Sequence, residues 1–409
     1  MSRRLAALLL AAALVTARAH ADTQQFATFD AASMEEDDEN FLDHFQSRLP
    51  DEWRAEWEAA TAALRTSQGC LTSGTWHQWD EFKARAPMTD RAWLDFSFVQ
   101  TTDPQASWEW VRFDFTRATR WGTFAGRFQP AYDKSQQDLA ALWRWGDGTR
   151  PLELQATFTF VDALNSFWEF RQARVGNHSE PYRAHPFEPE LVVISRGAHR
   201  RLEAQAKWLT PSRKDIDDPD AALSGRSSLW GSHVFVDAEQ DLARWTLLAR
   251  YDGTQALSAQ QLNGTPGDGR NYRRAWSAEA GVRRALGPRL RIEGRYAYGN
   301  RAEDWHPPVA DAAFRGLDRM GALLVHWTAR PSLELITGLL YDRIGITRTG
   351  AVPDFSYGTR KESRGLIGLQ TRIGNVRLQG LEGIELDSEP YPVTFHHDKA
   401  YVQLQTTFR

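Results

Sequence analysis

The sequence predicts an all-β protein, a closed antiparallel barrel of about sixteen strands that crosses a membrane. Three observations lead to this prediction. Polar and apolar residues alternate along many segments, short and long connections take turns between these segments, and aromatic residues gather at the segment ends. The 409 residues carry a formal net charge of −4, so the charge balance predicts no nucleic-acid partner.

The N-terminus has the features of an export signal. Two arginines precede an apolar run from Leu5 to Val15, and Ala19-His20-Ala21 offers the small residues of a cleavage site. We therefore predict a signal peptide over 1–21. A single cysteine excludes a disulfide framework within the chain. The mean hydropathy of −0.54 fits a chain with no later stretch of about 20 apolar residues, the length that a membrane-spanning helix needs.

Residues 22–90 are predicted to form an acidic, partly helical segment. Leu42, Phe45 and Leu49 recur at helical spacing, and Pro50 is placed to begin a second short helix that ends before residue 67. Such a segment can lie in the periplasm or plug a larger structure. It can also hold Ca²⁺ through its carboxylates, or be only a solvated leader.

From residue 91 onward the period of the pattern changes from 3.6 to 2. In 152–160 every even position is apolar and every odd position is polar. Alternation of this kind gives a strand one apolar face and one polar face. The barrel is therefore predicted to span 91–409 with about sixteen strands, within a range of 14–18. A candidate strand near 75–84 would break the even parity on its own, so it is assigned to an entry segment, and a total of eighteen strands stays open as an alternative. The sixteen predicted strands begin near residues 91, 107, 119, 138, 150, 189, 200, 228, 241, 271, 289, 315, 332, 361, 376 and 397.

The connections favour a membrane barrel over a soluble sandwich. A sandwich buries the apolar face of its strands, whereas a membrane barrel turns that face to lipid. Outer-membrane barrels have short periplasmic turns and long external loops, and a sandwich has no reason to alternate in this way. Long external loops are predicted at 162–188, 210–227, 253–270, 300–314 and 346–360.

Aromatic residues on the apolar parity predict two interfacial girdles, where rings prefer to sit. The outer girdle is predicted at the outer ends of upward strands and comprises Phe160, Trp208, Tyr251, Tyr298 and Tyr341. The inner girdle comprises Trp145, Trp327 and Phe408.

The last segment, Ala400–Phe408, resembles the C-terminal signature of Gram-negative outer-membrane proteins. In that class the alternation ends in a terminal aromatic residue that the barrel-assembly machinery recognises, although here Arg409 follows Phe408. The resemblance implies the outer membrane of a Gram-negative bacterium, with lipid and lipopolysaccharide as partners. The size of 91–409 is similar to that of a sixteen-stranded porin barrel. Whether the barrels form homo-oligomers is left open.

The polar parity of the strands predicts the residues that line the lumen. A barrel of this size is wide enough for an aqueous channel unless something fills it. Facing rows of opposite charge can support solute flow, or they can simply pair across strands and brace the wall. The predicted lining residues are Arg112, Asp114, Arg127, Arg144, Glu153, Arg201, Glu203, Arg244, Arg250, Arg289, Arg291, Glu293 and Arg295.

Two external loops offer further candidate sites. The loop at 162–188 is the third external loop, and in porins, which the barrel resembles, this loop folds inward and narrows the pore. Its candidate constriction residues are Trp168, Glu169, Arg171 and Arg174. A weaker candidate is a Ca²⁺ site, because carboxylate oxygens are the ligands this cation takes. Its residues are Asp215, Asp217, Asp218 and Asp220.

No enzyme is predicted. His178-Ser179 and His396-His397 are each adjacent pairs, so on a strand their side chains would point to opposite faces. No phosphate-binding loop or zinc-ligand spacing occurs. The sequence therefore predicts a porin-like channel for passive diffusion of small polar solutes. The alternative is a plugged structural or assembly barrel that anchors a periplasmic partner or exports a polymer.

Overall fold

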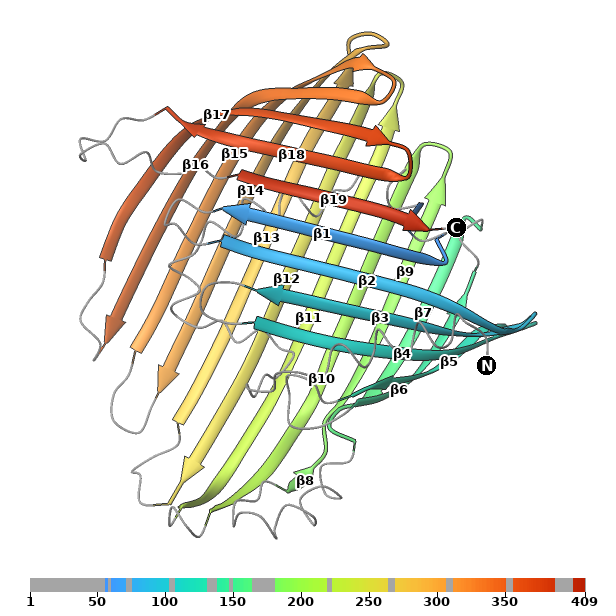
Figure 1. Ribbon diagram of the computed structural model, residues 1–409. Helices are drawn as coiled ribbons and strands as arrows, with labels where there is room; N and C mark the ends of the chain where they lie inside the picture. The colour runs from blue at the N-terminus through green and yellow to red at the C-terminus, as the bar shows by residue number, and fades with distance from the viewer. Residues whose placement is uncertain are drawn as a thin grey trace.

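A single antiparallel sheet closes on itself in the computed structural model of the chain. The structure describes residues 56–57, 60–70, 76–102, 107–130, 138–146, 150–163, 181–218, 223–263, 269–306, 312–350, 356–386 and 400–408. Each strand pairs with its neighbours in sequence, and the sheet closes where β1 pairs with both β2 and β19 (Figure 1). The short β8 pairs only with the far part of β10, so eighteen strands form the wall of the barrel.

The strands alternate in direction around the wall. In chain order they are β1 (Ala62–Cys70), β2 (Trp76–Thr89), β3 (Ala92–Thr102), β4 (Ser107–Thr119), β5 (Gly122–Gln129), β6 (Asp138–Trp145), β7 (Leu152–Phe160), β8 (Tyr182–Ala184), β9 (Phe187–Gly197), β10 (Arg200–Asp218), β11 (Leu223–Leu242), β12 (Trp245–Leu262), β13 (Gly269–Ala285), β14 (Leu290–His306), β15 (Ala312–Arg330), β16 (Leu333–Gly350), β17 (Ser356–Ile373), β18 (Val376–Glu385) and β19 (Ala400–Phe408).

Each of the sixteen predicted strands coincides with one strand of the wall, β3–β7, β9–β18 and β19. The prediction of about sixteen strands leaves out the hairpin of β1 and β2. The barrel has eighteen strands instead, and it begins at Ala62 and not at residue 91. Because this hairpin adds two strands, the parity of the barrel is kept. The helix expected up to residue 67 is also wrong beyond residue 61, and Leu64 lies on the outer face of β1.

The two-residue connections between described strands of the wall all lie at one end of the barrel, which we call the tight-turn end. They occupy 90–91, 120–121, 198–199, 243–244, 331–332 and 374–375, and the four-residue connection 286–289 lies at the same end. The favoured two-residue hairpin turns use backbone conformations with positive φ, which Ala243 (φ 56°) and Gly374 (φ 63°) adopt in two of them. Ala62 pairs with Phe408, so the first and last strands begin and end at this same end.

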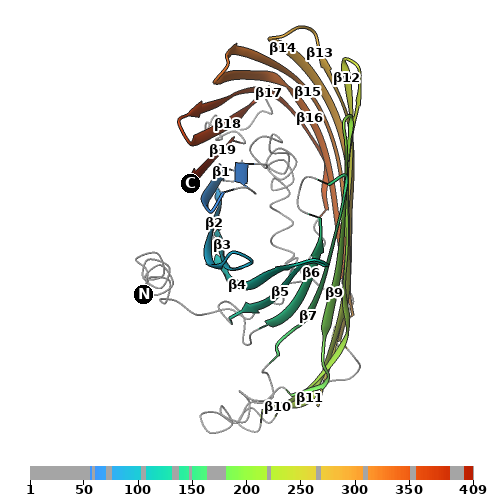
Figure 2. The same ribbon diagram turned by 90° about the vertical axis from the view of Figure 1, so that its right-hand side faces the viewer.

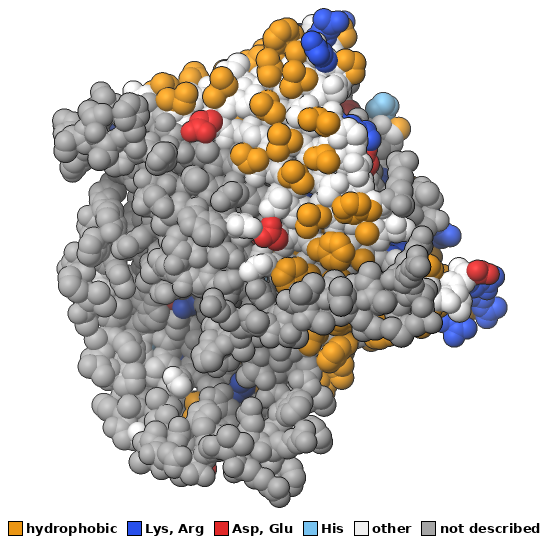
Figure 3. All heavy atoms as spheres, viewed as in Figure 1, with side chains coloured by type: hydrophobic (Ala, Val, Ile, Leu, Met, Phe, Trp, Pro, Cys, Tyr) orange, Lys and Arg blue, Asp and Glu red, His pale blue; other side chains and the backbone are white. Residues whose placement is uncertain are grey.

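The outer face of the barrel carries a continuous apolar band next to the tight-turn end. Large apolar side chains there are exposed in register on successive strands, as with Leu335 (37% exposed) on β16 and its direct partner Leu369 (38% exposed) on β17. Figure 3 shows apolar side chains gathered over β18, β19, β1 and β2, with few charges among them. Exposing such a band to water would be unfavourable, whereas contact with lipid would not. The closed barrel also leaves no strand edge with unpaired backbone groups, as a bilayer requires. Within the described residues, no helix is long and apolar enough to cross a membrane.

The wall has two parts of different height. Strands β10–β17 have 17–20 residues each, and we call them the tall wall. The other strands of the barrel, which have 8–14 residues, form the low wall. Figures 1 and 2 show the tall wall rising far beyond the low wall at the end opposite the tight turns. A strand tilted by about 45° crosses a bilayer in roughly 9–11 residues. Every strand of the tall wall is much longer than that, whereas in the low wall only β2 and β4 exceed it, with 14 and 13 residues.

Four of the five predicted long loops are therefore largely strand. Residues 210–218 continue β10, 253–262 continue β12, 300–306 continue β14 and 346–350 continue β16. Backbone pairing continues along these extensions, but their outer side chains are mostly polar. The apolar alternation that identifies a lipid-facing strand is lost there, which is why the sequence pattern indicates loops.

Candidate functional site: the lumen charge ring

Paired charges line the lumen face of the wall in its tight-turn half. We call this set of ion pairs the lumen charge ring. Its members come from β1–β7, β9–β14 and β16–β18, and they lie on the parity opposite to the apolar band. Register fixes this arrangement, because residues that are Cα partners across a ladder point to the same face of a sheet.

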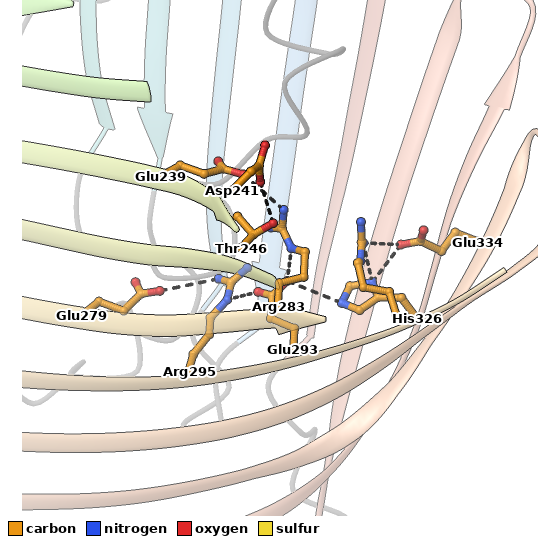
Figure 4. Close-up of polar contacts among 10 residues, drawn as sticks. Glu239, Asp241, Thr246, Glu279, Arg283, Glu293, Arg295, His326 and Glu334 are labelled. Carbon is orange, nitrogen blue, oxygen red and sulfur yellow. Dashed lines mark hydrogen bonds and ion pairs between the residues drawn. The ribbon is translucent and has the colours of Figure 1, made fainter. Parts of the chain in front are cut away.

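The densest part of the ring centres on Glu293 of β14. Its carboxylate is 1% exposed and accepts a hydrogen bond from Nε of Arg283 at 2.9 Å and another from Arg295. Figure 4 shows Glu239 and Glu279 on the far sides of these two guanidiniums, at 3.6 Å from Arg283 and 3.9 Å from Arg295. Burying a carboxylate is costly unless it is paired and hydrogen-bonded, so both arginines are needed to keep Glu293 in the wall.

His326 of β15 extends this cluster toward β16. Its Nδ1 lies 2.8 Å from Oε1 of Glu334, and Nη2 of Arg291 lies 3.0 Å from both of these atoms. Its other ring nitrogen is 3.9 Å from Glu293 (Figure 4). The imidazole therefore connects two carboxylates of the wall. Its described polar neighbours are charged side chains and include no serine.

Two further clusters share one carboxylate between two arginines. Glu153 of β7 is 2.6 Å from Arg196 and 3.1 Å from Arg144. Asp237 of β11 is 3.4 Å from Nη1 of Arg201 and 3.4 Å from Nε of Arg250, and Arg201 also donates to Glu203 at 2.5 Å. Each carboxylate thus braces two or three neighbouring strands.

The low wall completes the ring with simple pairs. Asp114 of β4 receives two parallel hydrogen bonds of 2.8 Å from Arg127 of β5, the bidentate geometry that an arginine fork favours. Arg85 and Asp95 form a similar pair between β2 and β3, with distances of 2.6 and 3.2 Å. Arg65 lies 3.6 Å from Glu81 across β1 and β2.

The two signs of charge are not equally accessible from the lumen. In the pair of Glu153 with Arg144, the carboxylate side chain is 3% exposed and the arginine 46% exposed. The same holds for Glu293 with Arg283, at 1% and 26%. Some arginines, such as Arg295, are themselves buried. On balance, a solute at this wall meets guanidinium groups in front of carboxylates.

The N-terminal segment reaches the same end of the lumen. Two arginines, Arg372 on β17 and Arg377 on β18, are direct cross-strand partners. Glu56 bridges them, with oxygen atoms 2.7 and 2.5 Å from the Arg377 guanidinium and 3.2 Å from that of Arg372. Since like charges directly opposite each other destabilise a sheet, this bridge offsets a repulsion built into the wall.

Trp57 strengthens this attachment, which we call the N-terminal latch. Its ring is buried, with Cζ of Arg65 at 4.2 Å and Nζ of Lys83 at 5.1 Å from its centroid. Cations over an indole face are attracted by its quadrupole. The amide of Ala60 donates to the carbonyls of Glu56 and Trp57 at 3.1 and 3.3 Å, so backbone hydrogen bonds hold the latch close to the start of β1.

Above the latch, the lumen face of β14–β18 carries a buried apolar cluster. Leu324, Leu340, Leu366 and Leu381 project to the lumen and are each only 2–4% exposed, in one cluster with Met320, Ile336, Ala297 and Ala322. A lumen face that is apolar and buried departs from the polar lumen that the sequence predicts. The missed signal is the loss of alternation in 321–325 and 335–340, where both parities are apolar.

Most predicted lining residues lie on the lumen parity and take part in the ring, and Arg112 also lies on the lumen face, on β4. The two exceptions are Arg244 and Arg289. These two fall in the tight turns 243–244 and 286–289, so their assignment to the strand wall is wrong. For the remaining residues, the role of lining a pore stays a prediction. Sequence reasoning missed Arg196, Asp237 and the latch, since strands β9 and β11 alternate poorly and Glu56 lies outside the predicted barrel.

The aromatic residues lie on the outer parity, and several are strongly exposed, including Trp208, Trp327, Tyr251, Tyr341 and Phe408. Their predicted place at strand ends is wrong for β10, β12, β14 and β16, where Trp208, Tyr251, Tyr298 and Tyr341 lie in mid-strand with polar extensions beyond them. Phe160 and Trp145 do lie at the ends of β7 and β6.

Several candidate residues fall outside the described part of the chain. These are the constriction residues Trp168, Glu169, Arg171 and Arg174, the pairs His178-Ser179 and His396-His397, the signal peptide 1–21 and Asp220. Asp215, Asp217 and Asp218 belong to β10 and not to a loop, and the Asp215 carboxylate accepts a hydrogen bond from Arg183. No cluster of three or more metal-ligating side chains occurs among the described residues.

No protein-family profile and no curated protein sequence matches this chain. Solved structures with a similar arrangement include OccAB3 of Acinetobacter baumannii, at 9% identity and a TM-score of 0.41 over 86% of this chain and 99% of that one. OmpT, an outer-membrane protein of Vibrio cholerae, matches at 10% identity and a TM-score of 0.36, over 85% and 98% of the two chains. CdiB from Acinetobacter baumannii matches at 10% identity and a TM-score of 0.40 over 85% of this chain, which spans 60% of CdiB.

The wall is closed, its outer face carries an apolar band, and its inner face carries paired charges. The chain is therefore a membrane-spanning antiparallel β-barrel of eighteen strands, with the architecture of outer-membrane-type barrels.

Proposed function

We propose that the barrel is a channel through which small polar solutes diffuse, with a mild preference for anions. The observation that carries the proposal is the lumen charge ring, because a wall of paired charges offers polar contacts to a solute without binding it tightly. Apolar side chains would serve better if the interior only had to be packed, since replacing buried ion pairs by apolar groups is often neutral or stabilising.

The anion preference follows from exposure rather than from charge number. Acidic and basic side chains occur on the described lumen face in similar numbers, so the net charge of the wall favours neither sign. The carboxylates of Glu153 and Glu293 lie behind their arginines, whose outer donors stay accessible. An anion can therefore approach guanidinium groups, whereas a cation cannot reach the carboxylates as closely. Salt screens this effect beyond about 8 Å at physiological ionic strength.

The test is the reversal potential of the purified full-length barrel in a planar bilayer under a KCl gradient. We expect open-channel steps and a reversal potential on the anion side. The variant Arg144→Gln, Arg291→Gln, Arg372→Gln removes three accessible guanidiniums and should move the reversal potential toward the cation side. Each substitution leaves its carboxylate a second basic partner, namely Arg196, His326 and Arg377.

The matched control carries Arg213→Gln and Arg226→Gln, two exposed arginines on the outer face of the tall wall. This control should leave the reversal potential unchanged. Wild-type channels that prefer cations would contradict the charge argument. Absence of conductance in every preparation would contradict the channel itself.

A second candidate function, a plugged barrel that anchors a partner or exports a polymer, is favoured by the N-terminal latch. The latch holds residues 56–57 against the lumen wall, and the neighbouring apolar cluster of β14–β18 faces the lumen yet is buried. In this function the N-terminal segment obstructs the lumen. We expect the variant Glu56→Gln and a chain lacking 22–55 to conduct strongly while the wild type does not. Equal conductance in all three would exclude the plug and leave the open channel.

A further inference from the structure

Three basic residues form a row on the outer face of the tall wall. Arg319 of β15 is the direct partner of Arg343 of β16, which in turn is the direct partner of Lys361 of β17. All three side chains are exposed, and their parity is that of the apolar band, so they point away from the lumen. Since neighbouring strands lie about 4.8 Å apart, the row spans roughly 10 Å of the surface.

This row is unfavourable for the protein alone. Like charges directly opposite each other destabilise a sheet, and here two such pairs adjoin. Elsewhere the chain neutralises similar charges: Glu56 bridges Arg372 and Arg377, and Asp304 lies 2.6 Å from Arg315 on the same outer surface. No carboxylate among the described residues pairs with Arg319, Arg343 or Lys361, and the described contact of Arg319 is with the ring of Tyr298, at 5.7 Å.

The height of the row places it at a membrane surface. Tyr298 is the direct partner of Arg319, and Tyr341 lies two residues from Arg343 on the same face. Tyrosines of barrels concentrate where the apolar band ends and headgroups begin. Below the row lie exposed apolar residues such as Leu339 and Ile367, and above it lie exposed polar residues such as Thr347 and Thr349. The row therefore faces the headgroup layer beyond the band.

We propose that Arg319, Arg343 and Lys361 form a binding site for the phosphate groups of lipopolysaccharide in the outer leaflet. A phosphate accepts paired hydrogen bonds from guanidinium forks and attracts an ammonium group, so one phosphorylated sugar can engage the whole row. The acyl chains of the same molecule then lie against the apolar band directly beneath. Arg274 of β13 lies farther from the apolar band than the row and adds positive charge above it. The ligand thus supplies the negative charge that the protein lacks there.

The proposal is tested by titrating the folded full-length barrel in neutral detergent with diphosphorylated lipid A. The probe set also contains lipid A stripped of its phosphates and phosphatidylglycerol. The variant Arg319→Gln, Arg343→Gln, Lys361→Gln should weaken binding of diphosphorylated lipid A by at least roughly tenfold, because it loses charge-assisted hydrogen bonds. The control Arg226→Gln, Arg315→Gln, which removes arginines that lie beside Asp215 and Asp304, should change it less than about twofold.

Thermal unfolding gives a second readout that a merely structural role would not produce. Without ligand, the triple variant should be at least as stable as the wild type, because repulsion is removed. Diphosphorylated lipid A should then raise the unfolding temperature of the wild type only. If the triple variant does not fold, the single variant Arg343→Gln at the centre of the row takes its place. Equal binding by the wild type and these variants would overturn the site. Equally tight binding of phosphatidylglycerol would overturn the assignment to lipopolysaccharide.

Discussion

The tall wall and the low wall use the same backbone pairing but differ in what surrounds them. Strands of the low wall, such as β7 with 9 residues, are about as long as a bilayer crossing requires. Strands of the tall wall, such as β11 with 20 residues, continue well past it. Their outer side chains change from apolar to polar near Trp208, Tyr251, Tyr298 and Tyr341. Lipid therefore determines where apolar and polar side chains alternate along a strand, whereas backbone hydrogen bonding determines where the strand ends.

The largest effect that tests this comparison is an all-or-none labelling difference between the two ends of the barrel. We expect the tight turns to face the periplasm, because exported barrels keep their long extensions outside. In a Cys70→Ser background, Asp217→Cys on the tall-wall extension should react with an impermeant thiol reagent on intact cells. Asp90→Cys in the β2–β3 turn should react only after the outer membrane is opened. The reverse order of labelling would invert the topology.

The next effect contrasts two outer positions of one tall-wall strand. Leu339→Arg places a charge in the apolar band of β16 and should reduce the free energy of unfolding by roughly 2–4 kcal/mol. Thr347→Arg lies on the polar extension of the same strand and should cost about 0–1 kcal/mol. On the low wall, Leu154→Arg on the lipid face should cost more than Gln155→Arg on the lumen face. Denaturant titration in lipid vesicles measures all four variants. Equal costs for Leu339→Arg and Thr347→Arg would refute the boundary between lipid and water, and equal costs for Leu154→Arg and Gln155→Arg would refute the assignment of the two faces.

The smallest effect concerns the N-terminal latch, which joins β17 of the tall wall to β18 of the low wall. Glu56→Gln leaves Arg372 and Arg377 opposed without their carboxylate and should cost roughly 1–3 kcal/mol. Arg377→Gln removes the repulsion together with the hydrogen bonds, so the double variant should be less destabilised than the sum of the single variants. A double-mutant cycle by denaturant titration measures this coupling. Additive costs would show that the bridge between Glu56 and Arg377 contributes nothing in solution.

The fold was largely predictable from the sequence because lipid imposes a strong pattern. In 152–160 and 289–298, strict alternation identifies both the strand and its outer face, and the exposed Phe158 and Tyr296 agree with that reading. β1 was missed because Ala62–Cys70 contrasts its two faces weakly and follows an acidic segment with helical spacing. β2 was considered only as a candidate strand near 75–84, because a single extra strand would break the even parity of the barrel. The tall-wall extensions were missed because water, unlike lipid, places no apolar requirement on the outer face.

The candidate site was only partly predictable. Parity alone assigns Arg127 and Asp114 to one face, but their bidentate geometry depends on the register between β4 and β5. The burial of Glu153 and Glu293 behind their arginines depends on side-chain packing that no spacing rule encodes. The latch joins residues that are 321 positions apart in the chain, a pairing that only closure of the barrel can bring about.

The central claim, that the membrane ends midway up the tall wall, is tested most directly by a depth profile along one strand. Spin labels placed singly at Leu335, Leu339, Thr347 and Thr349 all lie on the outer parity of β16. Power-saturation measurements in lipid vesicles compare collisions with oxygen, which concentrates in lipid, against collisions with a water-soluble nickel complex. We predict that oxygen dominates at Leu335 and Leu339 and nickel at Thr347 and Thr349, with the crossover near Tyr341. A uniform preference for oxygen up to Thr349 would place the whole tall wall in lipid and contradict the account.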